Sequence, residues 1–211
     1  MEEEFATLEK ADPEPKIIGL TGGIGSGKSS VAKIIEKQGF PVYYSDVRAK
    51  EIVNEDPALI AQIIQILGED AYDEHGNYNR KWVAKKVFND DNLLSQLNQT
   101  IHPAVKIDFE NWAKQQKSEL IFKETALLFE LKLNTEVYKT LLVTAEDNLR
   151  MKRVMDRDHK NYREVEAIMQ KQMPEKDKCR LADYIIQNNG SIEELAKETE
   201  IILDKISETI L

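Results

Sequence analysis

The sequence predicts an α/β fold in which helices cover a five-stranded parallel sheet and two helical insertions extend from it. Short apolar runs alternate with amphipathic helical patterns, an order typical of parallel sheets. A glycine-rich loop joins the first apolar run to the first helical pattern. The stretch 47–117, between the second and third apolar runs, is too long for one crossover and holds several helical patterns. These features indicate a three-layer core with a helical subdomain.

Five segments have the composition of buried strands, because they are short, apolar and bounded by turn or loop residues. In chain order they are 17–20, 42–44, 120–124, 141–143 and 184–186. These segments predict four parts of the chain: a disordered acidic extension at 1–15, a core at 16–46, 118–145 and 183–211, a helical acceptor-binding insertion at 47–117, and a basic lid at 146–182.

Helix boundaries follow from capping residues and apolar spacing. The first helix is expected over 29–38, ended by Gly39. In the first insertion, one helix starts at Asp56-Pro57 and ends before Gly68, a second carries Leu93, Leu94 and Leu97, and a third carries Val105, Phe109 and Trp112. Capping boxes are expected at three further helix starts: Thr144 with Asp147, Asn161 with Glu164, and Ser191 with Glu194.

Composition limits the classes of partner. With 211 residues and 41% hydrophobic content, the chain can bury one sizeable core. A net charge of -9 argues against a general nucleic-acid binder, and no apolar run approaches the ~20 residues that span a bilayer. The single cysteine, Cys179, excludes an internal disulfide, so we expect a cytoplasmic protein. We expect a small-molecule partner and a monomer or weak homo-oligomer.

A complete phosphate-binding loop follows the first strand. Its fixed positions match G-x-x-x-x-G-K-[ST] with Gly22, Gly27, Lys28 and Ser29. Glycines bring backbone N–H groups close to phosphate oxygens, and the N-terminus of the next helix favours an anion. Lys28 adds a charge for the β- and γ-phosphates, and the Ser29 hydroxyl can bind Mg²⁺. The motif predicts a nucleoside triphosphate, with the loop residues Gly23, Ile24, Gly25, Ser26, Gly27, Lys28, Ser29 and Ser30 around it.

Three classes of protein share this loop: small-molecule kinases, GTPase switches, and mechanical or non-catalytic nucleotide binders. A GTPase should carry N-K-x-D, which is absent, and D-x-x-G, whose one literal match is 73–76 in a polar stretch. Glu124 only partly resembles the acidic pair of mechanical ATPases. Residues 150–180, with ten Lys or Arg against six Asp or Glu, suit the basic lid of a kinase.

Two groups of side chains are candidates for phosphoryl transfer. Arg150, Arg153 and Arg157 recur at helical spacing, so they project to similar sides. The alternative is a solvated face paired with acids such as Glu146, and it weighs most for Arg150. Asp46 follows the second strand, where a carboxylate can orient an attacking hydroxyl or accept its proton. The alternative is a helix N-cap for the segment from Val47 onward, and the two roles are compatible.

Beyond the loop, several segments are similar to one family, dephospho-coenzyme A kinase. The resemblance runs from about Lys16 to the closing helix. It rests on these segments in order: Gly19-Leu20-Thr21-Gly22-Gly23-Ile24-Gly25-Ser26-Gly27-Lys28-Ser29, then Leu97 through Ile101-His102-Pro103, then Leu127-Leu128-Phe129-Glu130, then Arg153 with Arg157-Asp158, and finally Ala182-Asp183 with Ile186, Asn188 and Gly190.

The resemblance implies a P-loop kinase fold and ATP- and Mg²⁺-dependent phosphorylation of the ribose 3′-hydroxyl of dephospho-coenzyme A. It implies these roles by position: Asp46, Lys28, Arg153 and Arg157 in catalysis; Asn188 and Gly190 near the adenine of ATP; Thr21, Asp46, Lys50, His102, Leu128 and Glu130 toward the acceptor; and Ser29 toward the metal.

The chain departs from the family pattern at four positions. Tyr44-Ser45-Asp46 replaces a common Asp-x-Asp, which leaves one carboxylate after the second strand. Lys50 stands where Arg or His is common, so it keeps the charge but loses bidentate geometry. Ala126 replaces a usual Pro, and Ile168 stands where the lid often has another Arg.

Overall fold

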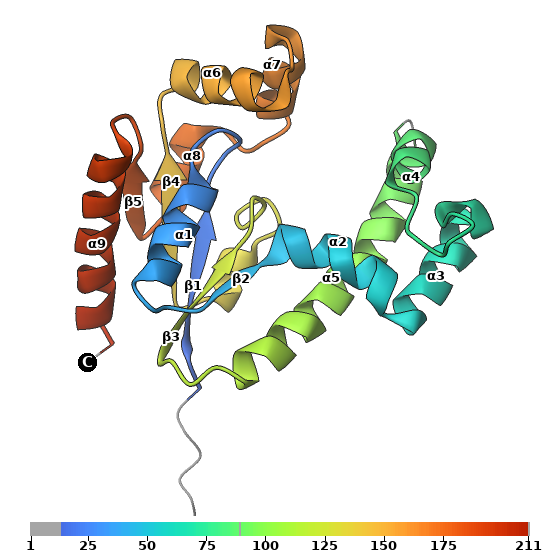
Figure 1. Ribbon diagram of the computed structural model, residues 1–211, viewed down its shortest axis with the longest axis horizontal. Helices are drawn as coiled ribbons and strands as arrows, with labels where there is room; N and C mark the ends of the chain where they lie inside the picture. Colours follow the sequence, from blue (N-terminus) through green and yellow to red (C-terminus); the bar gives the residue numbers. More distant parts are fainter. Residues whose placement is uncertain (1–13, 89, 211) are drawn as a thin grey trace, which may run out of the picture.

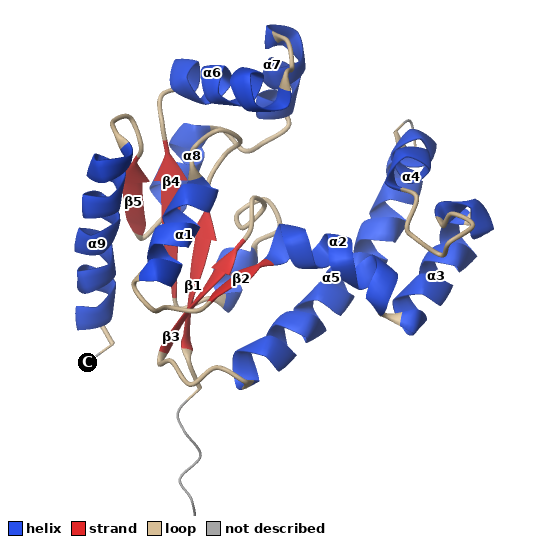
Figure 2. Cartoon of the chain, in the orientation of Figure 1, coloured by secondary structure: helices blue, strands red, loops and turns tan. Residues whose placement is uncertain are grey.

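A parallel sheet of five strands forms the centre of the computed structural model, which describes residues 14–88 and 90–210. The acidic extension expected at 1–15 lies almost wholly outside them. The strands are β1 (Lys16–Thr21), β2 (Val42–Tyr44), β3 (Leu120–Glu124), β4 (Lys139–Thr144) and β5 (Tyr184–Gln187). Their order across the sheet is β2-β3-β1-β4-β5, and all neighbours are parallel (Figures 1 and 2). The five predicted strands are confirmed.

The register of the central strands brings their carboxyl ends together. Leu20 of β1 pairs with Glu124 of β3 and with Leu141 of β4. The glycine-rich loop therefore leaves β1 beside the last residue of β3. In parallel α/β sheets, ligands bind in the crevice at this edge.

Helices cover both faces of the sheet. On one face, α1 (Lys28–Lys37) and α9 (Ile192–Glu208) pack together over a cluster that includes Ile18, Leu20 and Phe122. On the other face, Tyr43 and Ile121 join a second cluster made largely by the first insertion. The Ser191–Glu194 capping box at the start of α9 is confirmed.

The first insertion lies between β2 and β3 and forms a separate arm in Figure 1. Its elements are α2 (Ser45–Glu55), α3 (Pro57–Leu67), η1 (Glu69–Ala71), α4 (Arg80–Val87) and α5 (Asp91–Lys114). The expected start of α3 is confirmed, because Asp56 accepts hydrogen bonds from the amides of Ala58 and Leu59 at 2.8 and 3.2 Å.

The prediction of two helices over 93–97 and 105–112 is wrong, because α5 is one continuous helix with Pro103 inside it. Proline removes one backbone hydrogen bond from a helix interior. Leu97, Val105 and Phe109 are all buried in the same cluster on either side of Pro103. Burial of this shared face therefore outweighs the local cost of proline.

The second insertion stands over the carboxyl edge of the sheet in Figure 1. It contains α6 (Asp147–Asp158), α7 (Tyr162–Gln170) and α8 (Glu175–Leu181). The Asn161–Glu164 capping box of α7 is confirmed. The predicted box of Thr144 with Asp147 is wrong, because Thr144 ends β4 and Glu146 precedes α6 without a side-chain cap. A short 3₁₀ turn, η2 (Leu133–Glu136), precedes β4.

Within the described ranges no helix is long and apolar enough to cross a membrane.

Candidate functional site

The loop between β1 and α1 forms a cradle of backbone amides. Gly25 and Gly27 adopt left-handed conformations, with φ of 78° and 95°, which side chains other than glycine rarely adopt. In the described ranges no hydrogen bond uses the amides of Gly25, Gly27, Lys28 or Ser29. Lys28 is also the first residue of α1, so the helix N-terminus points at the same space. This arrangement suits an anion such as a phosphate group.

Lys28 is the charged centre of this cradle. Its ammonium forms an ion pair with Glu124, which is buried at the end of β3. Burial lowers the pKa of Lys28 to about 8; the Asp46 carboxylate acts in the opposite direction, and the Lys178 ammonium adds to the lowering. Tyr44 of β2 and Leu20 of β1 both pair with Glu124 of β3, so Asp46 and the loop that carries Lys28 leave the sheet at the same edge.

Asp46 and Lys50 lie on the same face of α2, one turn apart and both exposed. Asp46 belongs to the first turn of α2, which follows β2 without a gap. Tyr44, the residue that replaces a family aspartate, donates a hydrogen bond to Glu36 Oε2 of α1 at 2.8 Å. Its hydroxyl is thus bound to α1, and Asp46 is the carboxylate that the 44–46 segment contributes.

A hydrogen-bond network fixes the helix that carries Asp46. Asp108 of α5 accepts hydrogen bonds from the Tyr43 hydroxyl at 2.6 Å and from Arg48 at 2.9 and 3.0 Å. Arg48 lowers the pKa of Asp108, and the Tyr43 hydrogen bond acts in the same direction against the effect of burial. The end of β2, the start of α2 and the middle of α5 are therefore tied to one carboxylate.

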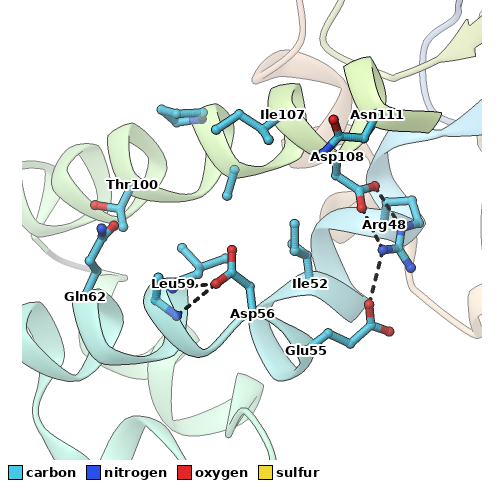
Figure 3. A pocket seen from close by; sticks show the side chains of 13 residues that line it. Arg48, Ile52, Glu55, Asp56, Leu59, Gln62, Thr100, Ile107, Asp108 and Asn111 are labelled. Carbon is cyan, nitrogen blue, oxygen red and sulfur yellow. Dashed lines mark hydrogen bonds and ion pairs between the residues drawn. The ribbon is translucent and has the colours of Figure 1, made fainter. Parts of the chain in front are cut away.

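This network also forms one end of a groove of about 450 Å³ between α2, α3 and α5 (Figure 3). Ile52, Leu59 and Ile107 line its apolar part, and Arg48 bonds to Asp108 and Glu55 at its polar end. No residue of the glycine-rich loop and no Asp46 lines it. The groove is therefore separate from the amide cradle.

The lid arginines occupy three different environments. Arg153 is partly buried, with Nη2 at 3.5 Å from Asn188 Oδ1, and its Nη1 is buried without a hydrogen-bond partner in the described structure. Arg157, one turn further along α6, is exposed and forms a bidentate pair with Asp158 at 2.6 and 2.8 Å. Arg150 is almost fully buried and bonded to acids. Helical spacing alone did not separate these environments.

Asn188 reaches the loop, whereas Gly190 does not. The Asn188 side chain is buried, and its Nδ2 donates to the Ser26 carbonyl at 2.8 Å. A Cβ on Gly27 would collide with this amide. Gly190 is exposed in the turn before α9, where a Cβ would collide with Glu194.

The residues expected to face the acceptor are dispersed. Leu128 is fully buried and packs against Gly19 of β1. Thr21 is fully buried at the end of β1, and its hydroxyl has no partner in the described ranges. His102 is exposed in the middle of α5, and partial desolvation lowers its pKa. Among the residues that the structure describes, no hydrogen bond or ion pair joins His102 to Asp46 or to the loop.

Comparison with known proteins identifies the family. A sequence model of dephospho-CoA kinase matches residues 16–194. The chain belongs to the dephospho-CoA kinase family. Dephospho-CoA kinase of Fusobacterium nucleatum is 36% identical over 191 residues, which are 90% of this chain and 98% of the relative.

Two solved structures agree with this assignment at the level of the fold. The structure of TT1252 from Thermus thermophilus has 32% sequence identity and a TM-score of 0.80, and the match covers 92% of this chain and 98% of that one. Dephospho-CoA kinase from Campylobacter jejuni has 23% identity and a TM-score of 0.69, with the same coverage. The α/β P-loop kinase fold expected from the sequence is therefore confirmed.

Sequence reasoning missed two charged residues of this kinase-family site. Lys178 of α8 is fully buried, and its Nζ lies 2.9 Å from Glu130 Oε1. Glu130 also accepts a hydrogen bond from the Met173 amide at 3.1 Å. In the sequence, Glu124 only partly matches the acidic pair of mechanical ATPases, yet in the structure it forms an ion pair with Lys28. A lysine in a basic stretch carries no local signal of burial, so only the packing of α8 reveals Lys178.

Proposed function

We propose that this chain transfers the γ-phosphoryl group of ATP to the ribose 3′-hydroxyl of dephospho-CoA, with Asp46 as the carboxylate that orients and deprotonates that hydroxyl. The observation that carries the proposal is the place of Asp46 in the first turn of α2, directly after β2, at the same edge of the sheet where the amide cradle leaves β1. A general base must stand beside the phosphoryl group to be transferred. Family membership supplies the acceptor.

The cradle and the lid divide the remaining work. The free amides of the loop and Lys28 would hold the β- and γ-phosphates in line with the acceptor. Arg153, with a buried Nη1 that has no protein partner in the described ranges, would donate to the transferring phosphoryl oxygens. Arg157 lies further out and would contribute when the lid closes. Lys50, on the same face as Asp46, would meet an anionic group of the acceptor.

The oxygen donor at the start of α1 fits Mg²⁺. Ser29 is exposed there, beside the free amides of the loop. Hard oxygen ligands of this kind, completed by phosphate oxygens and water, are those that Mg²⁺ prefers. When bound, the ion would offset negative charge on the phosphates.

The proposal includes the setting of the reaction. We propose that the protein acts on a small-molecule acceptor in the cytoplasm, as a monomer or weak homo-oligomer and without a nucleic-acid partner. This proposal is supported by the net charge of -9 and the single cysteine.

Replacement of Asp46 by Asn tests the central role. We expect kcat to fall by about 100-fold or more, the usual contribution of a general base, with the ATP dissociation constant changed less than about threefold. Product is measured by mass after incubation with ATP, Mg²⁺ and a panel of acceptors that includes nucleoside monophosphates. Asp70→Asn, at an exposed carboxylate of the same insertion, is the matched control.

Two results would contradict the proposal. Near-normal turnover of the Asp46→Asn variant would remove Asp46 from the mechanism. Phosphorylation of a nucleotide by the unaltered chain, without formation of coenzyme A, would overturn the acceptor.

A further inference from the structure

Both backbone polar groups of Ile24, in the middle of the glycine-rich loop, are bonded to lid side chains. Its N–H donates to Gln172 Oε1 at 2.9 Å. Its carbonyl accepts from Arg150 Nε at 3.1 Å. Gln172 lies between α7 and α8, and Arg150 lies on α6, so two separate parts of the lid hold one peptide unit on each side of Ile24.

Arg150 is held in place by acids. Its Nη1 lies 3.1 Å from Asp147 Oδ1 of the same helix and 3.0 Å from Glu175 Oε2, on the first residue of α8. The residue is 3% exposed. Two carboxylates and a carbonyl thus engage its guanidinium, whereas Arg153 keeps a buried Nη1 without a partner in the described ranges. Arg150 therefore contacts the loop rather than serving a phosphate.

The position of Arg150 accounts for two glycines that the general phosphate-binding motif leaves free. A Cβ on Gly23 would collide with Arg150 Nη2, and a Cβ on Gly25 would collide with the Arg150 carbonyl. Only Gly25 of these two has a positive φ. The side chain of Arg150 therefore excludes a side chain at Gly23, while both its main chain and the local backbone exclude one at Gly25.

We propose that Arg150 and Gln172 are positioning residues that clamp the peptide units of Ile24 and so hold the loop amides in their phosphate-binding arrangement. The amides of Gly25, Gly27 and Lys28 converge on one anion only if the preceding peptide units keep their orientation. The clamp rests on the proposed function, because it acts through ATP. Arg150 and Gln172 therefore contribute to ATP affinity before the lid closes.

A double-substitution cycle tests the clamp. The variants are Gly23→Ala, Arg150→Ala and their combination, and the readouts are the ATP dissociation constant by calorimetry without acceptor, and kcat and KM for both substrates. Each single substitution should weaken ATP binding by about tenfold, the factor that corresponds to loss of one charge-assisted hydrogen bond. The bond in question is the one from Arg150 to the Ile24 carbonyl: Arg150→Ala removes its donor, and Gly23→Ala displaces the guanidinium. The double variant should bind ATP no worse than Arg150→Ala, because the alanine at position 23 occupies space that the guanidinium has left.

Gly25→Ala is the matched control, because Arg150→Ala leaves the main chain of residue 150 in place and should give no rescue there. Arg150→Ala removes the partner of the Glu175 carboxylate, whereas Gln172→Ala removes a neutral side chain and leaves every ion pair intact. Gln172→Ala should raise KM for ATP more than it changes kcat or KM for dephospho-CoA. Thermal unfolding of each variant shows that it is folded.

The clamp is overturned if Gly23→Ala weakens ATP binding as much in the Arg150→Ala background as in the unaltered chain. It is also overturned if Arg150→Ala and Gln172→Ala both leave the ATP dissociation constant within twofold of the original. Because ATP binding is measured without acceptor, failure of the unaltered chain to form coenzyme A would sink the proposed function and still leave the clamp to be decided.

Discussion

Substitution of Glu130 by Gln should destabilise the fold because it leaves the ammonium of Lys178 buried without its counter-charge. Lys178 has no solvent exposure, and its Nζ lies 2.9 Å from Glu130 Oε1. Removing one partner of a buried ion pair typically costs about 3–5 kcal/mol. The Glu130 side chain is 18% exposed, and a Gln oxygen can still accept a hydrogen bond, so we expect about 2–3 kcal/mol.

The assay is urea unfolding at pH 7, followed by circular dichroism. For a chain of this size the loss corresponds to a fall in Tm of about 4–12 °C. Asp177→Asn, at the exposed pair of Asp177 with Arg180, is the control and should leave the midpoint unchanged. Glu130→Gln combined with Lys178→Met should recover much of the loss, because an apolar side chain then replaces the unpaired charge.

The pair of Glu130 and Lys178 also predicts that the free energy of unfolding falls at acid pH. Burial would raise the pKa of Glu130, but the Lys178 ammonium and two backbone amides hold it below its usual 4.5. The contribution of Glu130 is therefore present above about pH 4.5 and is lost as the pH falls through the lower folded-state pKa. A loss below 1 kcal/mol on Glu130→Gln at pH 7 would refute the view that Lys178 depends on this carboxylate.

Three further predictions concern ATP binding and the long helix. Because burial lowers the pKa of Lys28 to about 8, calorimetric ATP affinity should fall between pH 7 and 9, with proton uptake on binding, and Lys28→Met should abolish both effects. Arg153→Ala should lower kcat/KM for ATP by about 100-fold in steady-state assays, and Arg157→Ala by less than about tenfold; equal losses would contradict their different environments. Pro103→Ala should raise the free energy of unfolding by about 1–3 kcal/mol in urea, since it restores a backbone donor inside α5; a loss of stability would show that proline is accommodated without cost.

The strands and most helix starts of this fold can be predicted from the sequence because each depends on a few neighbouring residues. The five strands are short apolar runs, and the capping boxes at Asn161 and Ser191 need only residues three positions apart. The helix over α5 was divided wrongly because Pro103 is a strong local signal, whereas the burial of Leu97 and Phe109 on one face depends on the neighbouring helices. Tertiary packing outweighed local propensity there.

The site divides in the same way. Gly22 to Ser29 specify a triphosphate-binding loop by sequence alone, because the backbone conformation that binds phosphate requires those residue types between a strand and a helix. The order of the strands, which sets Glu124 beside Lys28, and the packing of α8, which buries Lys178 against Glu130, join residues far apart in the chain. The spacing of the lid arginines is visible in the sequence, but the contacts of each arginine depend on which elements meet in space. In the folded chain, Arg150 bonds to the Ile24 carbonyl of the loop, whereas Arg153 keeps a buried Nη1 without a partner in the described ranges.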